Sequence, residues 1–292
     1  MELVSIELVF TQILNGISLG MIYALMSLGL SLIYGLIGVV NFAHGAFFML
    51  GAYFVWQFME WGISYWLAMI LAAGLVGLIG LLIEPTIARR TYGEDLSKSL
   101  VVFFGLLIFL IQSARFQWGA LGKMFYIPNF LDFQINLGFT TYSFFRIFII
   151  VFTSMVVIAV YFFLEKTQLG LIIRAGIQNR EMVQALGINI YRMFTLVFVL
   201  GVILAAVAGI VSAPIISVRP EMGIDIQIVA FVVVVLGGMG SFLGSVVSGI
   251  IIGEASALIF LFEPRYSQLI IYVIMTMSLT FKESGLFGEV ER

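Results

Sequence analysis

Long apolar runs alternate with short polar intervals along this chain. A helix that crosses a bilayer needs about 20 apolar residues, whereas isolated sheets are excluded from lipid and barrel strands are shorter. By that measure the sequence predicts eight hydrophobic stretches, near 8–34, 39–58, 66–83, 100–114, 146–164, 193–216, 227–261 and 267–281. We therefore expect an all-α, polytopic integral membrane protein with about eight transmembrane segments. No polar interval is long enough for a soluble domain, so we expect one transmembrane domain over residues 1–292.

Glycine and polar residues interrupt this pattern in both halves of the chain. The stretch 227–261 would be about 50 Å long as one helix at about 1.5 Å per residue, and Gly237-Gly238-Met239-Gly240-Ser241 interrupts it. Residues 8–58 are interrupted by Gly35, Gly38, Asn41, His44, Gly45 and Gly51. Gly-interrupted hydrophobic segments in both halves are a sequence sign of a transport pathway. We therefore expect broken or re-entrant helices in both halves.

The composition fits a chain embedded in lipid. Hydrophobic residues make up 62% and charged residues 10%, against about half and a quarter in soluble domains. Mean hydropathy is +1.16. This excludes a disordered protein, a DNA-binding module and a secreted disulfide scaffold. The chain has no cysteine and one histidine, so we expect no metal site and no cofactor bound by this chain.

The placement of Lys and Arg predicts the orientation. The intervals 84–99 and 165–192 together hold seven basic residues, against three in 115–146. Basic loops stay in the cytoplasm, so 84–99 and 165–192 are predicted to be cytoplasmic and 115–145 external. No Lys or Arg precedes Arg89, which favours an external N-terminus. The start lacks a basic region and a clear cleavage site, so we expect no removable signal peptide.

The later interruption has the features of a polar helix end. Gly237, Gly238 and Gly240 permit unusual backbone conformations, and Ser241 is predicted to cap a helix that begins at Phe242. The positive pole of that helix would suit a carboxylate or carbonyl oxygen. We favour a role in the translocation pathway over packing alone. After the break, small residues recur every four positions and predict a close helix contact: Ser241, Ser245, Gly249, Gly253 and Ala257.

The earlier interruption, Asn41-Phe42-Ala43-His44-Gly45, is its counterpart. Asn41 is predicted to be an N-cap, and Asn41, His44 and Gly45 are pathway candidates because polar residues at membrane depth are costly and usually functional or paired. For His44 we favour a neutral hydrogen-bonding role between helices over a proton relay. Upstream, Gly16, Gly20 and Ala24 form another small face, for which helix contact is the default interpretation.

Some charged residues have simpler interpretations. Glu254 lies in an apolar run, where an unpaired carboxylate is costly. It reaches an interface, pairs with a partner subunit or, least favoured, carries a coupling proton. Glu84 and Arg89 are interpreted as ordinary interfacial charges.

One polar loop has the pattern of a docking element. In 165–192, Asn179 is a predicted N-cap, Glu181 suits the first turn and Gly187 is a predicted C-terminal stop. Met182, Val183 and Leu186 form an apolar stripe at three- and four-residue spacing. Such a stripe seeks a protein groove. At about two turns it is short for a helix lying on lipid, so we favour protein docking.

Three motifs spread over the chain resemble those of branched-chain amino acid ABC transporter permeases, in particular the smaller Liv-type high-affinity permease. They are RAGIQNREMVQALGINIYR at 174–192, VLGGMGSFLGSVVSGIIIGE at 235–254, and NGISLGMIYALMSLGLSLIYGLIGVVNFAHGAFFMLGAY at 15–53. The ending Gly285-Leu286-Phe287-Gly288 also fits, with Glu283-Ser284 where the family usually has Pro-Thr. The segment 115–145 takes no part in the resemblance.

The resemblance implies a subunit of an ATP-driven importer in a bacterial inner membrane. Such a permease pairs with a second, related permease and two ATPase subunits, and a periplasmic binding protein delivers its substrate. ATP and Mg would bind in the ATPases, since this chain has no phosphate-binding loop of its own. By position, the coupling helix would comprise Gln178, Asn179, Arg180, Glu181, Met182, Val183, Ala185, Leu186 and Gly187. Asn41–Gly45 and Gly237–Ser241 would line the path. Arg219, Glu221 and Asp225 would meet the binding protein or, as we favour, remain simply solvated.

Other functions stay open at this point. Relatives within the family carry urea, short amides and other organic solutes, and a neutral amide would suit helix ends as well as a zwitterion does. An ion-coupled transporter or channel would rely on Glu254 and would leave the loop at 179–187 unexplained. An intramembrane enzyme is set aside because the chain has no catalytic triad spacing, no HExxH and no paired carboxylates within a span.

Overall fold

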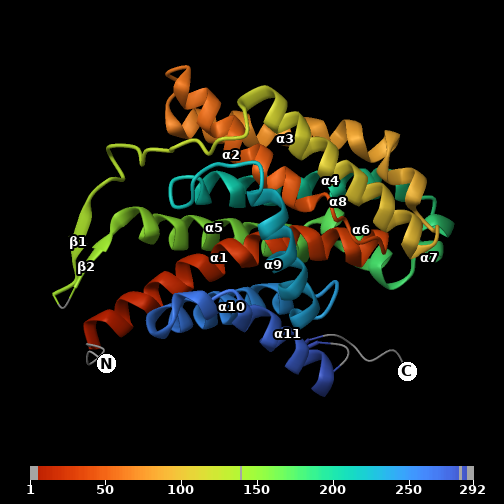
Figure 1. The fold of residues 1–292 in the computed structure, drawn as a ribbon. Coiled ribbons are helices and arrows are strands. Elements are labelled where there is room, and N and C mark those ends of the chain that lie inside the picture. Colours follow the sequence, from red (N-terminus) through yellow and green to blue (C-terminus); the bar gives the residue numbers. More distant parts are fainter. Residues whose placement is uncertain (1–5, 139, 283–284, 288–292) are drawn as a thin grey trace.

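The computed structural model describes residues 6–138, 140–282 and 285–287. Its long helices lie side by side and run mostly along one direction, with a β-hairpin at one end and α7 at the other (Figure 1). In chain order the elements are α1 (Ile6–Ile37), α2 (His44–Glu60), α3 (Tyr65–Thr86), η1 (Ala88–Thr91), α4 (Leu96–Trp118), β1 (Gln134–Asn136), β2 (Thr141–Ser143), α5 (Phe144–Lys166), α6 (Gln168–Gln178), α7 (Arg180–Ala185), α8 (Ile190–Ser212), α9 (Met222–Gly237), α10 (Phe242–Phe262), η2 (Pro264–Tyr266) and α11 (Leu269–Phe281). Glu283, Ser284 and Gly288 of the family-like ending lie outside the described residues.

Six helices in the described part are long and apolar enough to cross a membrane: α1, α3, α4, α5, α8 and α10. Three other apolar helices are shorter, with 17 residues in α2, 16 in α9 and 13 in α11. Each predicted hydrophobic stretch overlaps one of these helices, except that 227–261 is divided between α9 and α10.

The two ends of the bundle differ in what they carry. At the hairpin end, Thr11 near the start of α1 lies 3.2 Å from Thr140, measured between the two hydroxyl oxygens. The start of α1 therefore lies on the same side as the segment 115–145. At the α7 end, Arg89 of η1 donates a hydrogen bond to Thr195 in the first turns of α8. The two basic intervals, 84–99 and 165–192, thus gather at the α7 end, opposite the hairpin.

The main seam of the bundle joins α1 to α10, which run antiparallel (Figure 1). A Cβ atom at Gly253 would collide with the backbone of Gly20, and one at Gly249 would meet the backbone of Ala24. The two small-residue faces predicted from sequence are therefore partners of one another. Close backbone approach is how helices associate in lipid, where apolar burial gives little driving force between them. The predicted helix contact is confirmed for both faces.

The segment 115–145 folds over the hairpin end. Its hairpin pairs Gln134 with Ser143 and Asn136 with Thr141, and the loop before it is tied to the α8–α9 connection by a bridge between Lys123 and Val218. The sequence predicted no strand here, because three-residue strands leave no readable alternation.

Candidate functional site

The predicted docking helix is present as α7. The Asn179 side chain accepts a hydrogen bond from the Met182 backbone N–H at 2.9 Å, which makes Asn179 the N-cap. Gly187 has a φ of +81°, and its N–H donates to the Gln184 carbonyl at 2.9 Å. Both predicted ends of this helix are confirmed, because capping depends on local residue chemistry.

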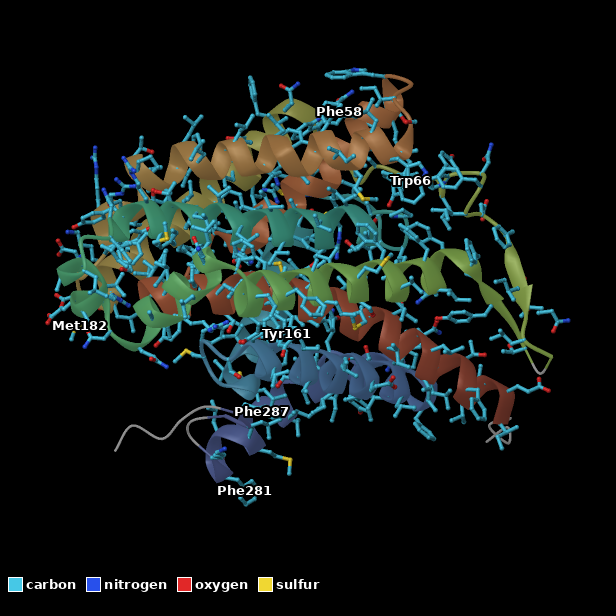
Figure 2. The ribbon with its side chains drawn as sticks, turned by 180° about the vertical axis from the view of Figure 1, so that it is seen from behind. Phe58, Trp66, Tyr161, Met182, Phe281 and Phe287 are labelled. Carbon is cyan, nitrogen blue, oxygen red and sulfur yellow. The ribbon has the colours of Figure 1, made fainter. Side chains whose placement is uncertain are left out.

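The apolar stripe on α7 is divided between two directions. Val183 is 2% exposed and packs into the chain's own core, whereas Met182 is 58% and Leu186 73% exposed. Figure 2 shows Met182 at the extreme end of the bundle. The prediction of one continuous docking stripe is wrong for Val183. Its burial anchors α7, and only Met182 and Leu186 remain available to a partner.

A second helix in this loop was missed. Residues 168–178 form α6, in which the Thr167 side chain accepts a hydrogen bond from the Gly170 N–H. A capping threonine followed by apolar residues at helical spacing was the sequence signal. Gln178 ends α6, so the predicted coupling segment spans the α6–α7 corner rather than one helix. Gln178, Glu181 and Ala185 are exposed there.

Arg180 links α7 to the first interrupted region. Its guanidinium lies over the Phe194 ring at 5.9 Å from the centroid. It also lies next to Gly38, where a Cβ atom would approach Arg180 Nη2 to 2.8 Å. Gly38 has a φ of +74° and stands in the link between α1 and α2. Arg180 therefore joins the start of α7 to the start of that link.

The first interruption ends in a buried polar cluster. The prediction that Asn41 caps a helix is wrong: α2 begins at His44, after Ala43, and Asn41 instead accepts a hydrogen bond from the Ala43 N–H at 3.0 Å. His44 Nε2 lies 3.1 Å from the Met26 carbonyl oxygen, and the ring is fully buried. The neutral hydrogen-bonding role between helices fits this geometry.

Gly45 connects this polar cluster to α9. Its N–H donates to Gln227 Oε1 at 2.6 Å, and a Cβ atom there would collide with the Gly223 carbonyl. Three nitrogens of the cluster have no hydrogen-bond partner among the described residues: Asn41 Nδ2, His44 Nδ1 and Gln227 Nε2. Unpaired polar atoms inside a bundle are costly and often mark a pathway.

The second interruption is a turn at the α7 end. Gly238 and Gly240 have φ values of +96° and +88°, and the Ser241 hydroxyl accepts from the Gly244 N–H at 3.1 Å. The predicted cap by Ser241 is confirmed. A cavity of about 400 Å³ adjoins the turn and is lined in part by Ser241, Tyr161 and Arg174.

The end of the described chain supports the same turn. Backbone N–H groups of Leu286 and Phe287 donate to the carbonyls of Leu236 and Gly237 at 2.8 and 3.1 Å. These are terminal carbonyls of α9, which have no partner inside their own helix. Sequence reasoning missed this contact because it joins segments about 50 residues apart.

The two interruptions meet only in part: a Cβ atom at Gly35 would lie 3.3 Å from Gly240 Cα, whereas Gly45 lies elsewhere along α9. Gly45 contacts the first turn of α9, whereas Gly237 is its last residue. Sixteen residues of helix separate such ends by about 24 Å. The candidate Gly45 therefore lies at one end of α9, and Gly237, Gly238, Gly240 and Ser241 lie at the other. Phe42, next to Asn41, packs on Phe231 within α9, with 5.9 Å between ring centroids.

Glu84 and Arg89, interpreted from the sequence as interfacial charges, form an ion pair around a buried carboxylate. The Glu84 side chain is fully buried and accepts two hydrogen bonds from Arg89, at 3.1 and 2.7 Å, and one from the Thr195 hydroxyl at 2.7 Å. It ties α3 and η1 to α8. The interpretation as ordinary interfacial charges is wrong, because the partner on α8 was not readable from spacing.

Charges at the hairpin end are paired at the surface. Arg115 contacts Glu221 at 2.5 Å, and Arg219 contacts Asp225 at 2.7 Å, with all four side chains about half exposed. The hydrogen bond from Arg115 lowers the pKa of Glu221 below its usual range. Glu254, in contrast, packs against Gly16 and has no ion pair among the described residues.

The chain is similar to known transport proteins along most of its length. Residues 12–279 match the family model described as branched-chain amino acid transport system / permease component. The chain belongs to this permease family. It is 30% identical to the high-affinity branched-chain amino acid transport system permease protein BraD of Pseudomonas aeruginosa over 96% of both chains. It is equally similar to LivH of Escherichia coli, again over 96% of both chains.

More distant likenesses extend the comparison. The permease protein LivM of Escherichia coli is 24% identical over 92% of this chain and 68% of its own. The solved structure of PsaBC from Streptococcus pneumoniae in complex with Fab has a TM-score of 0.49 at 12% identity, over 91% of this chain and 90% of that one. As a member of the permease family, the chain is a transport subunit and not an enzyme.

Proposed function

We propose that this chain is the membrane-spanning permease subunit of an ATP-driven importer for branched-chain or related hydrophobic amino acids. The observation that carries the proposal is the family match across residues 12–279. The exposed pair Met182 and Leu186 on α7 supports it, because an importer without its own nucleotide site needs a surface on which ATPases act.

The whole assembly follows from this proposal. Two ATPase subunits, which bind ATP and Mg, dock on α7 and on the corresponding helix of a second, related permease. A periplasmic binding protein delivers substrate at the hairpin end. The α7 end faces the cytoplasm of a bacterium, as the basic intervals gathered there favour, and the chain forms one domain in the inner membrane.

The span count also belongs to this proposal. Together with the six long helices, α2 and α11 bring the number of transmembrane segments to about eight. The short helix α9 is re-entrant, and α2 begins within the bilayer. Asn41–Gly45 and Gly237–Ser241 then line the path at different depths.

Related substrates and another transport class remain the alternatives. Urea, short amides and other small organic solutes would use the same machinery. An ion-coupled transporter is less well supported, since it gives no role to the exposed apolar side chains of α7.

Purification of the chain from its native membrane in mild detergent tests the assembly. We expect two ATPase subunits and one related permease to co-elute. Recovery of the chain alone, with transport that survives ATP depletion, would contradict the proposal.

A further inference from the structure

Two adjoining cavities lie toward the hairpin end, away from the second interruption, and Phe48, one turn after His44, lines the first of them. One has a volume of about 270 Å³ between α1, α9, α11 and the α8–α9 connection. The other, of about 340 Å³, lies between α1, α10 and α11. Arg146, Tyr23 and Gln268 line both cavities, so the two spaces meet at these side chains. Their volumes are near the lower limit of about 300 Å³ for small-molecule pockets.

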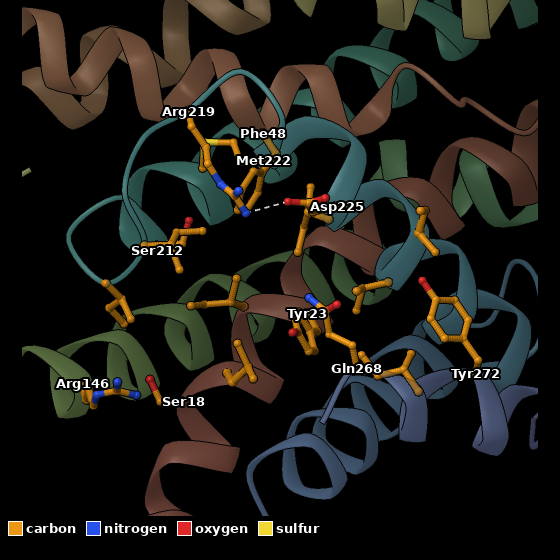
Figure 3. A pocket seen from close by; sticks show the side chains of 18 residues that line it. Ser18, Tyr23, Phe48, Arg146, Ser212, Arg219, Met222, Asp225, Gln268 and Tyr272 are labelled. Atoms are coloured by element: carbon orange, nitrogen blue, oxygen red, sulfur yellow. Dashed lines mark hydrogen bonds and ion pairs between the residues drawn. The ribbon is translucent and has the colours of Figure 1, made fainter. Parts of the chain in front are cut away.

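Arg146 is the charged side chain in the lining of these cavities that is not neutralised by an ion pair among the described residues. Arg146, in the first turn of α5, has no ion pair among the described residues. The other two charges, Arg219 and Asp225, neutralise one another at 2.7 Å. Figure 3 shows Arg146 beside Ser18 on one side of the first cavity and the Arg219–Asp225 pair on the other. A guanidinium without an acidic partner, next to an apolar interior, favours binding of an anion.

Two buried hydroxyl groups strengthen this assignment. Ser18 lines the first cavity and is fully buried, and Ser256 lines the second and is 6% exposed. Neither hydroxyl has a hydrogen-bond partner among the described residues. Buried hydroxyls without partners are uncommon, because each costs about 1–3 kcal/mol. A carboxylate at Arg146 would accept from such donors and remove that cost.

Apolar side chains complete the surroundings. Leu19, Ile215 and Ile271 line both cavities, and Ile22 and Ile226 line the first. Tyr23 and Gln268 add neutral oxygens to the lining of both cavities. A small molecule with one carboxylate, one further polar group and a branched aliphatic part matches this set.

We propose that Arg146, with Ser18 and Ser256, binds the carboxylate of an aliphatic amino acid as it enters from the hairpin end. This inference rests on the proposed function and names the residues that first receive the substrate within the membrane. Tyr23 and Gln268 accept hydrogen bonds from its ammonium group, and the aliphatic part lies against Leu19, Ile215 and Ile271. The site recognises the carboxylate by charge and the remainder by shape.

Protection of an introduced cysteine tests this site directly, because the chain itself has no cysteine. Ile215→Cys places a thiol on the wall of both cavities. Its reaction with the small neutral reagent methyl methanethiosulfonate is followed by the mass of this chain, in the assembled complex during ATP turnover. Leu121→Cys, at a residue 82% exposed at the same end and lining neither cavity, is the control thiol.

Three probes separate the contributions of the ligand's groups. We expect L-leucine to slow modification of Ile215→Cys at least threefold, and 4-methylpentanoate, which lacks the ammonium, to slow it too. We expect 3-methylbutylamine, which lacks the carboxylate, to give no protection. The rate at Leu121→Cys should stay unchanged with all three.

Matched variants show which residues the protection by L-leucine depends on. Arg146→Gln should remove protection by L-leucine, and Ser18→Ala should weaken it, while Arg265→Gln should retain it. Arg265 is an arginine at the same end whose side chain is 90% exposed. The unprotected modification rate and recovery of the complex show whether each variant is folded.

The outcomes separate this site from the proposed function. Absence of protection by L-leucine in a complex that transports it, or equal protection by the amine, would overturn the site. A complex that protects Ile215→Cys with L-leucine yet shows no ATP-dependent uptake would leave the site standing and contradict the proposed function.

Discussion

Leu186→Ala is the sharpest test of the docking surface on α7. Leu186 is 73% exposed in the isolated chain, so most of its apolar area is available to a partner. Complete burial of a leucine side chain contributes about 1.5–3 kcal/mol. Truncation to alanine leaves one carbon of four, so we expect about 1–2 kcal/mol of lost contact, which is about a 5- to 30-fold weaker ATPase affinity.

The stability of the chain should respond differently. Substitutions at exposed positions usually change the free energy of unfolding by about 0.5 kcal/mol or less, so Leu186→Ala should fold normally. Val183→Ala should show the opposite pattern, since Val183 is 2% exposed and anchors α7. It should lower the stability of the chain by about 1 kcal/mol or more.

Titration of the purified permease pair with its ATPase measures the affinity, and thermal unfolding of the same samples measures stability. Leu171→Ala is the matched control, because Leu171 on the neighbouring α6 is 60% exposed and lies outside the predicted coupling segment. An affinity for Leu186→Ala within twofold of that for Leu171→Ala would refute the assignment of this surface. Leu186→Asp should prevent assembly, because a docked carboxylate would be buried without a partner.

Three further predictions concern the frame of the molecule. Gly253→Ala should force α1 away from α10 and lower the free energy of unfolding by about 1–3 kcal/mol. Gly105→Ala should not, because Gly105 has open space around it. Equal melting temperatures for the two variants would contradict the close contact between α1 and α10. Glu84→Gln should cost about 1–3 kcal/mol by weakening a buried charged network, while Glu94→Gln, in a half-exposed pair, should shift the melting temperature little. Because the hydrogen bond from Arg115 lowers the pKa of Glu221 in the folded chain, the pair should stabilise the fold at neutral pH. That stabilisation should be lost as the pH falls below the usual carboxyl pKa and through the lowered pKa of the folded chain. Glu221→Gln should flatten that part of the stability-versus-pH curve, and an unchanged curve would count against the pair.

The sequence predicted what local chemistry determines. Asn179 and Ser241 cap the helices expected of them, and Gly187 ends α7, because a cap needs only its own side chain and the next few backbone groups. The hydrophobic stretches located the long helices for a similar reason. Asn41 departs from the rule because its side chain closes a turn before the helix starts.

What the sequence missed depends on distant partners. Burial of Glu84 depends on Thr195, and burial of Val183 depends on the core beneath α7. The separation of Gly45 from Gly237 follows from the course of α9, and the contact of Gly35 with Gly240 follows from the packing of α1, neither of which the spacing in the sequence reveals. Gly238 illustrates the consequence for experiments: at a φ of +96° its replacement by leucine would strain the turn itself, so lost transport would not by itself place Gly238 in the path.

ATP-dependent uptake of leucine by the reconstituted complex tests the central claim most directly. Proteoliposomes would contain this chain, its partner permease and the ATPases, with the loaded binding protein added at the hairpin end. We expect accumulation of L-leucine that requires ATP and disappears with Leu186→Asp. Uptake that proceeds without ATP, or that is unaffected by Leu186→Asp, would contradict the account.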